Sequence, residues 1–105
     1  MSRGEIYKLD VEQGVAIGDV QGCRELLDKW IQVSGAGAGD GFTGSLAIEI
    51  TIDGTHWVVA ATVTNAAELV EIPQTAFALR VNTLVAISAG GPAEAWLSGH
   101  MRHTD

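Results

Sequence analysis

The most constraining feature of the sequence is residues 45–52, where apolar side chains alternate strictly with small or polar ones. The apolar positions are Leu46, Ile48, Ile50 and Ile52. A period of two predicts a β-strand with one face against a core. Asp53 and Gly54 follow directly. Because glycine accepts the positive φ of a tight turn, this pair predicts a hairpin whose return strand covers residues 56–64.

Short apolar runs separated by turn residues fill the rest of the chain. They cover residues 15–17, 26–33, 69–72, 76–82, 84–88 and 93–98. Pro73 ends one run, and a Gly-Gly-Pro sequence at residues 90–92 separates the last two. A short helix over residues 24–30 competes with the strand over 26–33. The closely spaced turns predict an all-β fold, an antiparallel and jelly-roll-like β-sandwich of about 7–9 short strands.

Residues 1–13 mix charged side chains with isolated apolar ones and have no sustained period. They predict an N-terminal arm with at most one short strand, too poor in apolar surface to be needed for a core, ahead of a sandwich domain over residues 14–105. An extended arm can add a strand to the sheet edge of a neighbouring molecule. Its partner-binding anchors would be Ile6, Tyr7, Leu9 and Val11. A disordered terminus without a role is the open alternative.

Composition indicates one compact domain that meets a partner. The chain has 105 residues, of which 47% are hydrophobic and 18% charged. Such a chain is too apolar to be disordered, and part of its apolar surface is expected to contact another molecule. No apolar run approaches the roughly 20 residues that span a bilayer, and no cleavable leader is recognisable. We therefore expect a soluble, unprocessed chain.

Charge and cysteine content narrow the classes of partner. Six Lys and Arg residues against thirteen Asp and Glu residues give a formal charge of −7, and the basic residues form no stripe. Nucleic acid and anionic membranes are therefore not expected as partners. Cys23 is the single cysteine, so it cannot form an internal disulfide, which fits assembly in a reducing cytosol.

Two patterns point weakly to cofactor or metal binding. Residues 39–44 match the glycine pattern of phosphate-binding turns, but the segment that follows has the period of a strand rather than of a helix. A flexible glycine-rich loop over residues 35–44 is the favoured interpretation. His100, His103 and Asp105 could ligate a metal, but they lie where chain ends fray. We expect no cofactor and no metal.

Candidate catalytic and sugar-binding residues each have a simpler structural explanation. Cys23 is expected to be a small buried hydrophobe, and no nucleophile signature occurs. Glu68 and Glu71 are three residues apart, which places them on opposite faces of a strand rather than together. The chain is therefore not expected to be an enzyme. Exposed tryptophans can stack on sugars, but core or interface packing is favoured for Trp30, Trp57 and Trp96.

Several segments resemble small β-sandwich proteins of tailed bacteriophage virions. These segments are residues 41–57, with an Asp-Gly turn and a following Trp, residues 69–76, with an Ile-Pro corner, residues 79–83, with an Arg-Val-Asn strand, and residues 95–99. The resemblance covers roughly residues 30 to 105 and leaves the N-terminal third without support.

The resemblance implies a non-enzymatic structural protein of the virion. Within that group, a capsid decoration or cement protein fits best, one that binds the assembled lattice of the major capsid protein in many copies or as a homo-oligomer. Its location would be the virion, assembled in the host cytoplasm. The alternative is a carbohydrate-binding β-sandwich module of a phage tail or host-adhesion structure, which requires at least one tryptophan to lie exposed.

Overall fold

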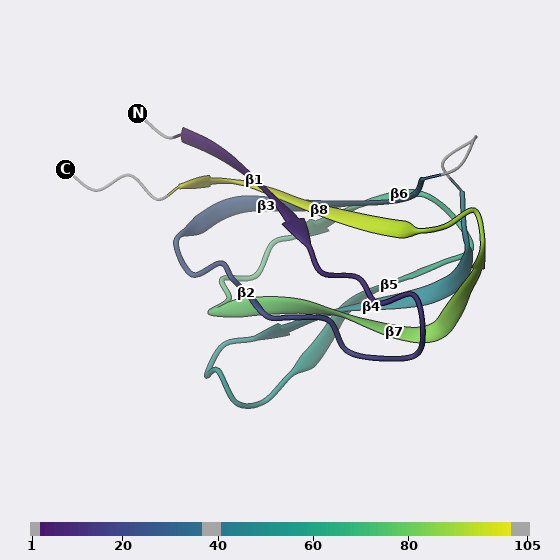
Figure 1. Cartoon of the computed structure of the whole chain (residues 1–105). Coiled ribbons are helices and arrows are strands. Elements are labelled where there is room, and N and C mark those ends of the chain that lie inside the picture. Colours follow the sequence, from purple (N-terminus) through teal and green to yellow (C-terminus); the bar gives the residue numbers. More distant parts are fainter. Residues whose placement is uncertain (1–2, 37–40, 102–105) are drawn as a thin grey trace.

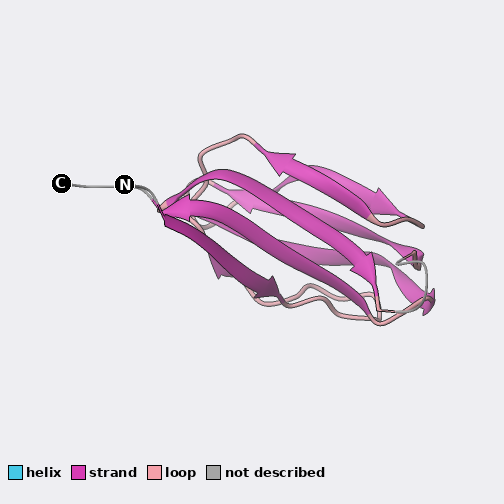
Figure 2. Cartoon of the chain, turned by 90° about the horizontal axis from the view of Figure 1, so that it is seen from above, coloured by secondary structure: helices cyan, strands magenta, loops and turns pink. Residues whose placement is uncertain are grey.

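The chain folds into two four-stranded antiparallel sheets that face each other (Figures 1 and 2). The computed structural model describes residues 3–36 and 41–101. Sheet A consists, in spatial order, of β1 (Arg3–Leu9), β8 (Ala93–Met101), β3 (Leu26–Gly35) and β6 (Glu68–Ile72). Sheet B consists of β2 (Gln21–Gly22), β7 (Ala78–Ala89), β4 (Thr43–Thr51) and β5 (Val58–Thr64).

The strand order identifies the architecture as a jelly roll. Every connection except that between β4 and β5 passes from one sheet to the other, so that β1 and β8 pair in sheet A while β2 and β7 pair in sheet B. This arrangement is two nested Greek keys, which defines the eight-stranded jelly roll. The predicted all-β, antiparallel, jelly-roll-like sandwich is therefore confirmed. Among the described residues there is no helix long and apolar enough to cross a membrane.

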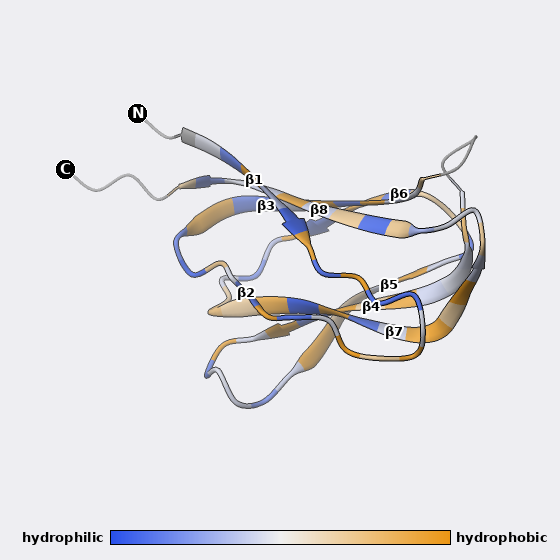
Figure 3. Ribbon diagram, viewed as in Figure 1, coloured by the Kyte–Doolittle hydropathy of each residue, from blue (hydrophilic) through white to orange (hydrophobic). Residues whose placement is uncertain are grey.

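The core lies between the inner faces of the sheets, where apolar side chains of both layers meet. Its fully buried members include Ile31, Val33 and Leu97 from sheet A and Leu46, Ile48, Leu79 and Val81 from sheet B. Figure 3 shows the apolar residues along both sheets. Leu46, Ile48 and Ile50 face the core as predicted. The other face is not open as expected, because its small residues Ser45, Ala47 and Thr51 are buried too, and Ile52 lies beyond the end of β4 and is exposed.

Several predicted strands differ from the observed ones in extent. Residues 24–30 form no helix, because strand β3 begins at Leu26. Residues 15–17 contribute only an isolated bridge from Ile17 to Asn82. The runs over 76–82 and 84–88 lie mostly in one continuous strand, β7. No turn separates them, and the register of β7 against β4 shifts near Ser45 instead.

In β5, the predicted return strand, the side chains that point to the core change from one set of alternate residues to the other part-way along. A register shift against β4 leaves Ala60 as an extra residue between the pairs Ile48–Ala61 and Glu49–Val59. Such a bulge reverses the side-chain alternation beyond it. Val63 therefore lies in the core, whereas Val59 is exposed, although an uninterrupted alternation over the predicted strand 56–64 would place both on one face.

The predicted N-terminal arm is largely built into the sandwich. All seven residues of β1 pair with β8, and Leu9 is buried in the core. Gln13 holds the far end of this segment to the turn between β7 and β8. Its side chain donates to the Ala93 carbonyl (3.1 Å) and accepts from the Ala93 N–H (2.8 Å), and its carbonyl accepts from the Ile87 N–H (2.7 Å). The expectation that this segment is too poor in apolar surface to serve the core is therefore wrong for Leu9.

The turn between β7 and β8 packs against the start of β4 by direct backbone contact. Gly90 has a φ of 73°, and a Cβ at this position would overlap the carbonyl oxygen of Gly41. Glycine is therefore required here both for its conformation and for its lack of a side chain. Gly35, in the predicted glycine-rich loop, is under the same constraint, because a Cβ there would overlap the carbonyl oxygens of Gly90 and Gly41. Residues 37–40 of that loop lie outside the described residues.

Candidate functional site

The free edge of sheet A is the first candidate for a binding surface. Strand β1 ends the strand order, and within the described ranges its backbone pairs with β8 alone. The other side of an edge strand presents N–H and C=O groups that can pair with another chain. Figure 1 shows β1 as the outermost strand beside β8.

The structure divides the four predicted anchor residues among three environments. Ile6 is 73% exposed on the outer face of sheet A. Tyr7 and Val11 are half-buried and pack against the core. Leu9 is buried, so it cannot serve as an anchor for a partner without leaving the core. The physical reason is alternation, because every second residue of a strand points inward.

Two tryptophans lie on the outer face of sheet A. The register places Ile6 opposite Ser98, and Ser98 opposite Trp30. It also places Trp96 between Lys8 on β1 and Gln32 on β3. Trp30 is 38% exposed and Trp96 is 36% exposed. Core packing, one of the two explanations favoured for these residues, is therefore wrong for both of them.

Lys8 partly covers one of these rings. Its ammonium lies 5.6 Å from the centroid of the Trp96 ring and 3.2 Å from a carboxylate oxygen of Glu94. Both charged side chains are accessible to water, so the ion pair itself contributes little stability. Its effect is to fix the Lys8 side chain over Trp96, which leaves Trp30 as the more open of the two indoles.

The third tryptophan lies on the outer face of the other sheet. The Trp57 ring stacks on the Arg80 guanidinium, 4.1 Å from ring centroid to Cζ. Arg80 Nε donates to Glu49 (2.7 Å), and Asn82 donates to the second oxygen of the same carboxylate (3.1 Å). Both oxygens of the Glu49 carboxylate therefore have hydrogen-bond donors, and the charge of Arg80 is neutralised by Glu49. Glu49, Arg80 and Asn82 thus have a structural role in stabilising sheet B.

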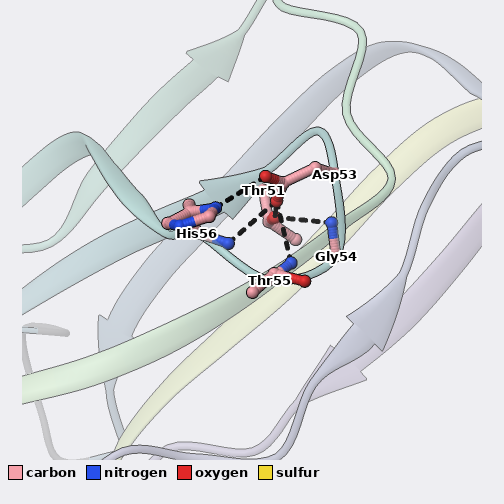
Figure 4. Close-up of polar contacts among 5 residues, drawn as sticks. All are labelled: Thr51, Asp53, Gly54, Thr55 and His56. Carbon is pink, nitrogen blue, oxygen red and sulfur yellow. Dashed lines mark hydrogen bonds and ion pairs between the residues drawn. The ribbon is translucent and has the colours of Figure 1, made fainter.

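The connection between β4 and β5 is a six-residue loop rather than the predicted two-residue turn. Gly54 has the expected positive φ, 83°. The Asp53 carboxylate organises the loop (Figure 4). It accepts hydrogen bonds from the backbone N–H groups of Thr55 and His56 (both 2.8 Å), from the Thr51 hydroxyl (3.1 Å) and, with its second oxygen, contacts His56 Nδ1 (2.7 Å).

The loop between β4 and β5, which Asp53 organises, makes the stability of the fold depend on pH. Hydrogen bonds from the backbone and ring of His56, then from Thr55, hold the pKa of Asp53 well below its ordinary value of 3.8. A carboxylate with a lowered folded-state pKa stabilises the fold above its ordinary pKa, and this contribution is lost as the pH falls below it. Asp53→Ala is therefore expected to lower the melting temperature at neutral pH, and the difference from wild type should shrink below pH 3.8.

Thermal melts of both proteins across the acid range measure this effect. Glu68→Ala, on the exposed edge strand β6, is the matched control and should change little at any pH. A difference between wild type and Asp53→Ala that stays constant from neutral to acid pH would show that the carboxylate's charge does not hold the loop.

The remaining candidates for catalysis and metal binding are separated in the structure. Cys23 is buried, as predicted, and burial raises the pKa of its thiol. Glu68 lies opposite Val33, and Glu71 lies opposite Trp30, so they point to opposite faces of β6 as predicted. His100 is exposed on β8, whereas His103 and Asp105 lie outside the described residues. Over residues 3–36 and 41–101, no three His, Cys, Asp or Glu side chains are placed to hold a metal.

A bulge in β3 beside Trp30 was not predicted from the sequence. The register of β3 against β8 shifts between Leu27 and Trp30, and Asp28 there adopts a left-handed conformation with a φ of 53°. Lys29, the next residue, is buried, and its ammonium donates to the Leu26 carbonyl (3.5 Å). No glycine or proline marks this position in the sequence, so no local signal could have revealed the bulge.

Comparison with known proteins supports the fold alone. No family model and no curated protein matches the sequence. Among solved structures, the chain is similar to the SPBc2 prophage-derived protein YomS, with a TM-score of 0.73 over 95% of both chains and 7% sequence identity. At this identity the similarity shows that the two proteins share a sandwich architecture over nearly their whole length.

Proposed function

We propose that this chain is a non-enzymatic structural protein of a bacteriophage virion, and more specifically a capsid decoration protein that binds the assembled head lattice. Two findings support a phage role. The sequence resembles virion β-sandwich proteins over residues 41–57, 69–76 and 79–83, and the fold is shared with a prophage-derived protein. A decoration protein needs no catalytic centre and gains affinity from many copies on a symmetric lattice.

The observation that carries the proposal is the open edge of β1 beside an exposed apolar side chain. Residues Arg3–Leu9 offer one side of an extended backbone, and Ile6 projects from the adjoining face. A segment of the major capsid protein would add to this edge as a further strand, with main-chain hydrogen bonds for affinity and Ile6 in an apolar pocket for specificity. Leu9 stays in the core, so Ile6 is the main side-chain anchor.

Co-sedimentation with phage particles that lack the chain tests this mode of attachment. Ile6→Glu is expected to weaken binding at least tenfold, because it places a charge in the apolar contact. Leu69→Glu is the matched control, since Leu69 is similarly exposed on the opposite edge strand of the same sheet. Equal binding of Ile6→Glu and wild type would contradict attachment through β1.

A further inference from the structure

A shallow hollow lies on the outer face of sheet A, next to Trp30. Its volume is about 420 Å³, and it is lined by residues of three strands, among them Ile6 of β1, Asp28 and Trp30 of β3, and Ser98 and His100 of β8. This volume lies within the range of small-molecule sites. The lining therefore includes one indole, one branched apolar side chain and four polar or ionisable residues, namely Glu5, Asp28, Ser98 and His100.

Two local features of the backbone create this hollow. The bulge between Leu27 and Trp30, with Asp28 at a φ of 53°, interrupts the regular alternation of β3, and Asp28 is one of the residues that line the hollow. Bulges commonly redirect a side chain at functional sites, and a left-handed non-glycine residue is a strained conformation that needs a reason. On β1, a Cβ at Gly4 would meet no atom within 4 Å, so the space above it is open.

We propose that this hollow binds a neutral glycan, with a pyranose ring stacked on Trp30. A pyranose has an apolar face of C–H groups, which suits the flat indole, and a rim of hydroxyl groups that both donate and accept hydrogen bonds. The Asp28 carboxylate accepts from such hydroxyls, while the Ser98 hydroxyl and the His100 ring can donate or accept. The combination of one aromatic wall and several polar groups at the rim is what a sugar requires.

The neighbouring tryptophan extends this site along the sheet. Trp96 lies on the same face, on the strand next to that of Trp30, and is displaced from it by two residues along the ladder. Gln32, opposite Trp96, adds an amide that both donates and accepts. Because the Lys8 ammonium lies over the Trp96 ring, Trp30 is the stacking position, and Trp96 and Gln32 border a second sugar unit along the sheet.

The negative charge of the chain, and the charged side chains on the outer face of sheet A, argue against ligands other than a neutral glycan. The formal charge of −7 disfavours phosphorylated ligands and nucleic acid, and it would oppose close packing of a second copy against the same surface. Glu71, Lys8 and Glu94 also interleave with the apolar residues here, whereas the centre of a protein interface is depleted of charge. A neutral, hydroxyl-rich ligand avoids these costs.

Titration with cellohexaose, chitohexaose and mannohexaose, followed by tryptophan fluorescence and by ¹H–¹⁵N NMR, tests the proposal. At least one of the three is expected to bind saturably at millimolar concentration. Trp30→Ala, which removes the stacking surface, and Gly4→Leu, which fills open space without a clash, should each weaken binding at least tenfold. Trp57→Ala is the matched control, because the Trp57 ring stacks on Arg80 of sheet B and not on sheet A, and it should bind as wild type does.

Three results would overturn the proposal. One is that none of the three oligosaccharides binds, and another is that Trp30→Ala binds as wild type does. The third is that sedimentation shows a dimer which Trp30→Ala and Gly4→Leu convert to monomers, because the face would then be an interface between copies. The proposal does not depend on the capsid role, which the location of the chain in purified particles tests separately. Because Ile6 borders both the edge of β1 and the hollow, Ile6→Glu alone does not separate the two.

Discussion

Deletion of residues 1–13 is expected to lower the free energy of unfolding by more than about 3 kcal/mol. The deletion removes the whole ladder between β1 and β8 and the burial of Leu9, which alone stabilises by about 2 kcal/mol. It also removes the hydrogen bonds of Gln13 to Ala93 and Ile87, each worth about 1 kcal/mol. Urea denaturation of the shortened and full-length chains measures the difference.

Ile6→Ala is the control for this deletion. It alters the same strand, but only at an exposed side chain, and is expected to change stability by less than about 0.5 kcal/mol. If the shortened chain instead unfolds at the same urea concentration as the full-length chain, residues 1–13 form a dispensable arm, and the pairing of β1 with β8 contributes nothing to stability.

Leu97→Ala is expected to cost about 2–5 kcal/mol, because it opens a cavity in the centre of the core. Leu97 lies on β8, between β1 and β3, and is fully buried against the opposite sheet. Leu69 is the same residue type on the edge strand of the same sheet, but it is 61% exposed. Leu69→Ala should therefore change stability by less than about 0.5 kcal/mol.

Comparison of these two leucine variants tests the layer arrangement directly. Thermal or urea denaturation gives both values under the same conditions. Equal losses of stability for Leu97→Ala and Leu69→Ala would mean that the two faces of sheet A are buried to the same degree. That result would conflict with a two-layer sandwich, in which the outer face of each sheet is exposed.

The part of the fold that follows from sequence is the part with sustained periodicity. Residues 45–52 alternate for long enough to define both the strand and its buried face, and the Asp-Gly pair marks the end of that strand. Strand β1 gives no such signal, because Tyr7 and Leu9 are its apolar residues that reach the core and its main support is the backbone of β8, far away in sequence. Long-range pairing of this kind cannot be recognised from local composition.

Bulges account for most of the remaining differences. The extra residue at Ala60 reverses the face of β5, and the bulge at Asp28 creates the hollow beside Trp30. Neither position carries a residue that marks a bulge. The outward orientation of Trp30 and Trp96 was missed for a related reason, since tryptophan suits both a core and an exposed platform, and only the register of β3 against β8 distinguishes the two.

Cryo-electron microscopy of purified phage particles that carry this chain tests the central claim most directly. We expect density for the jelly roll in regular copies on the outer surface of the head, with the edge of β1 against the major capsid protein. Absence of the chain from purified particles, or its presence on the tail alone, would contradict a capsid decoration protein.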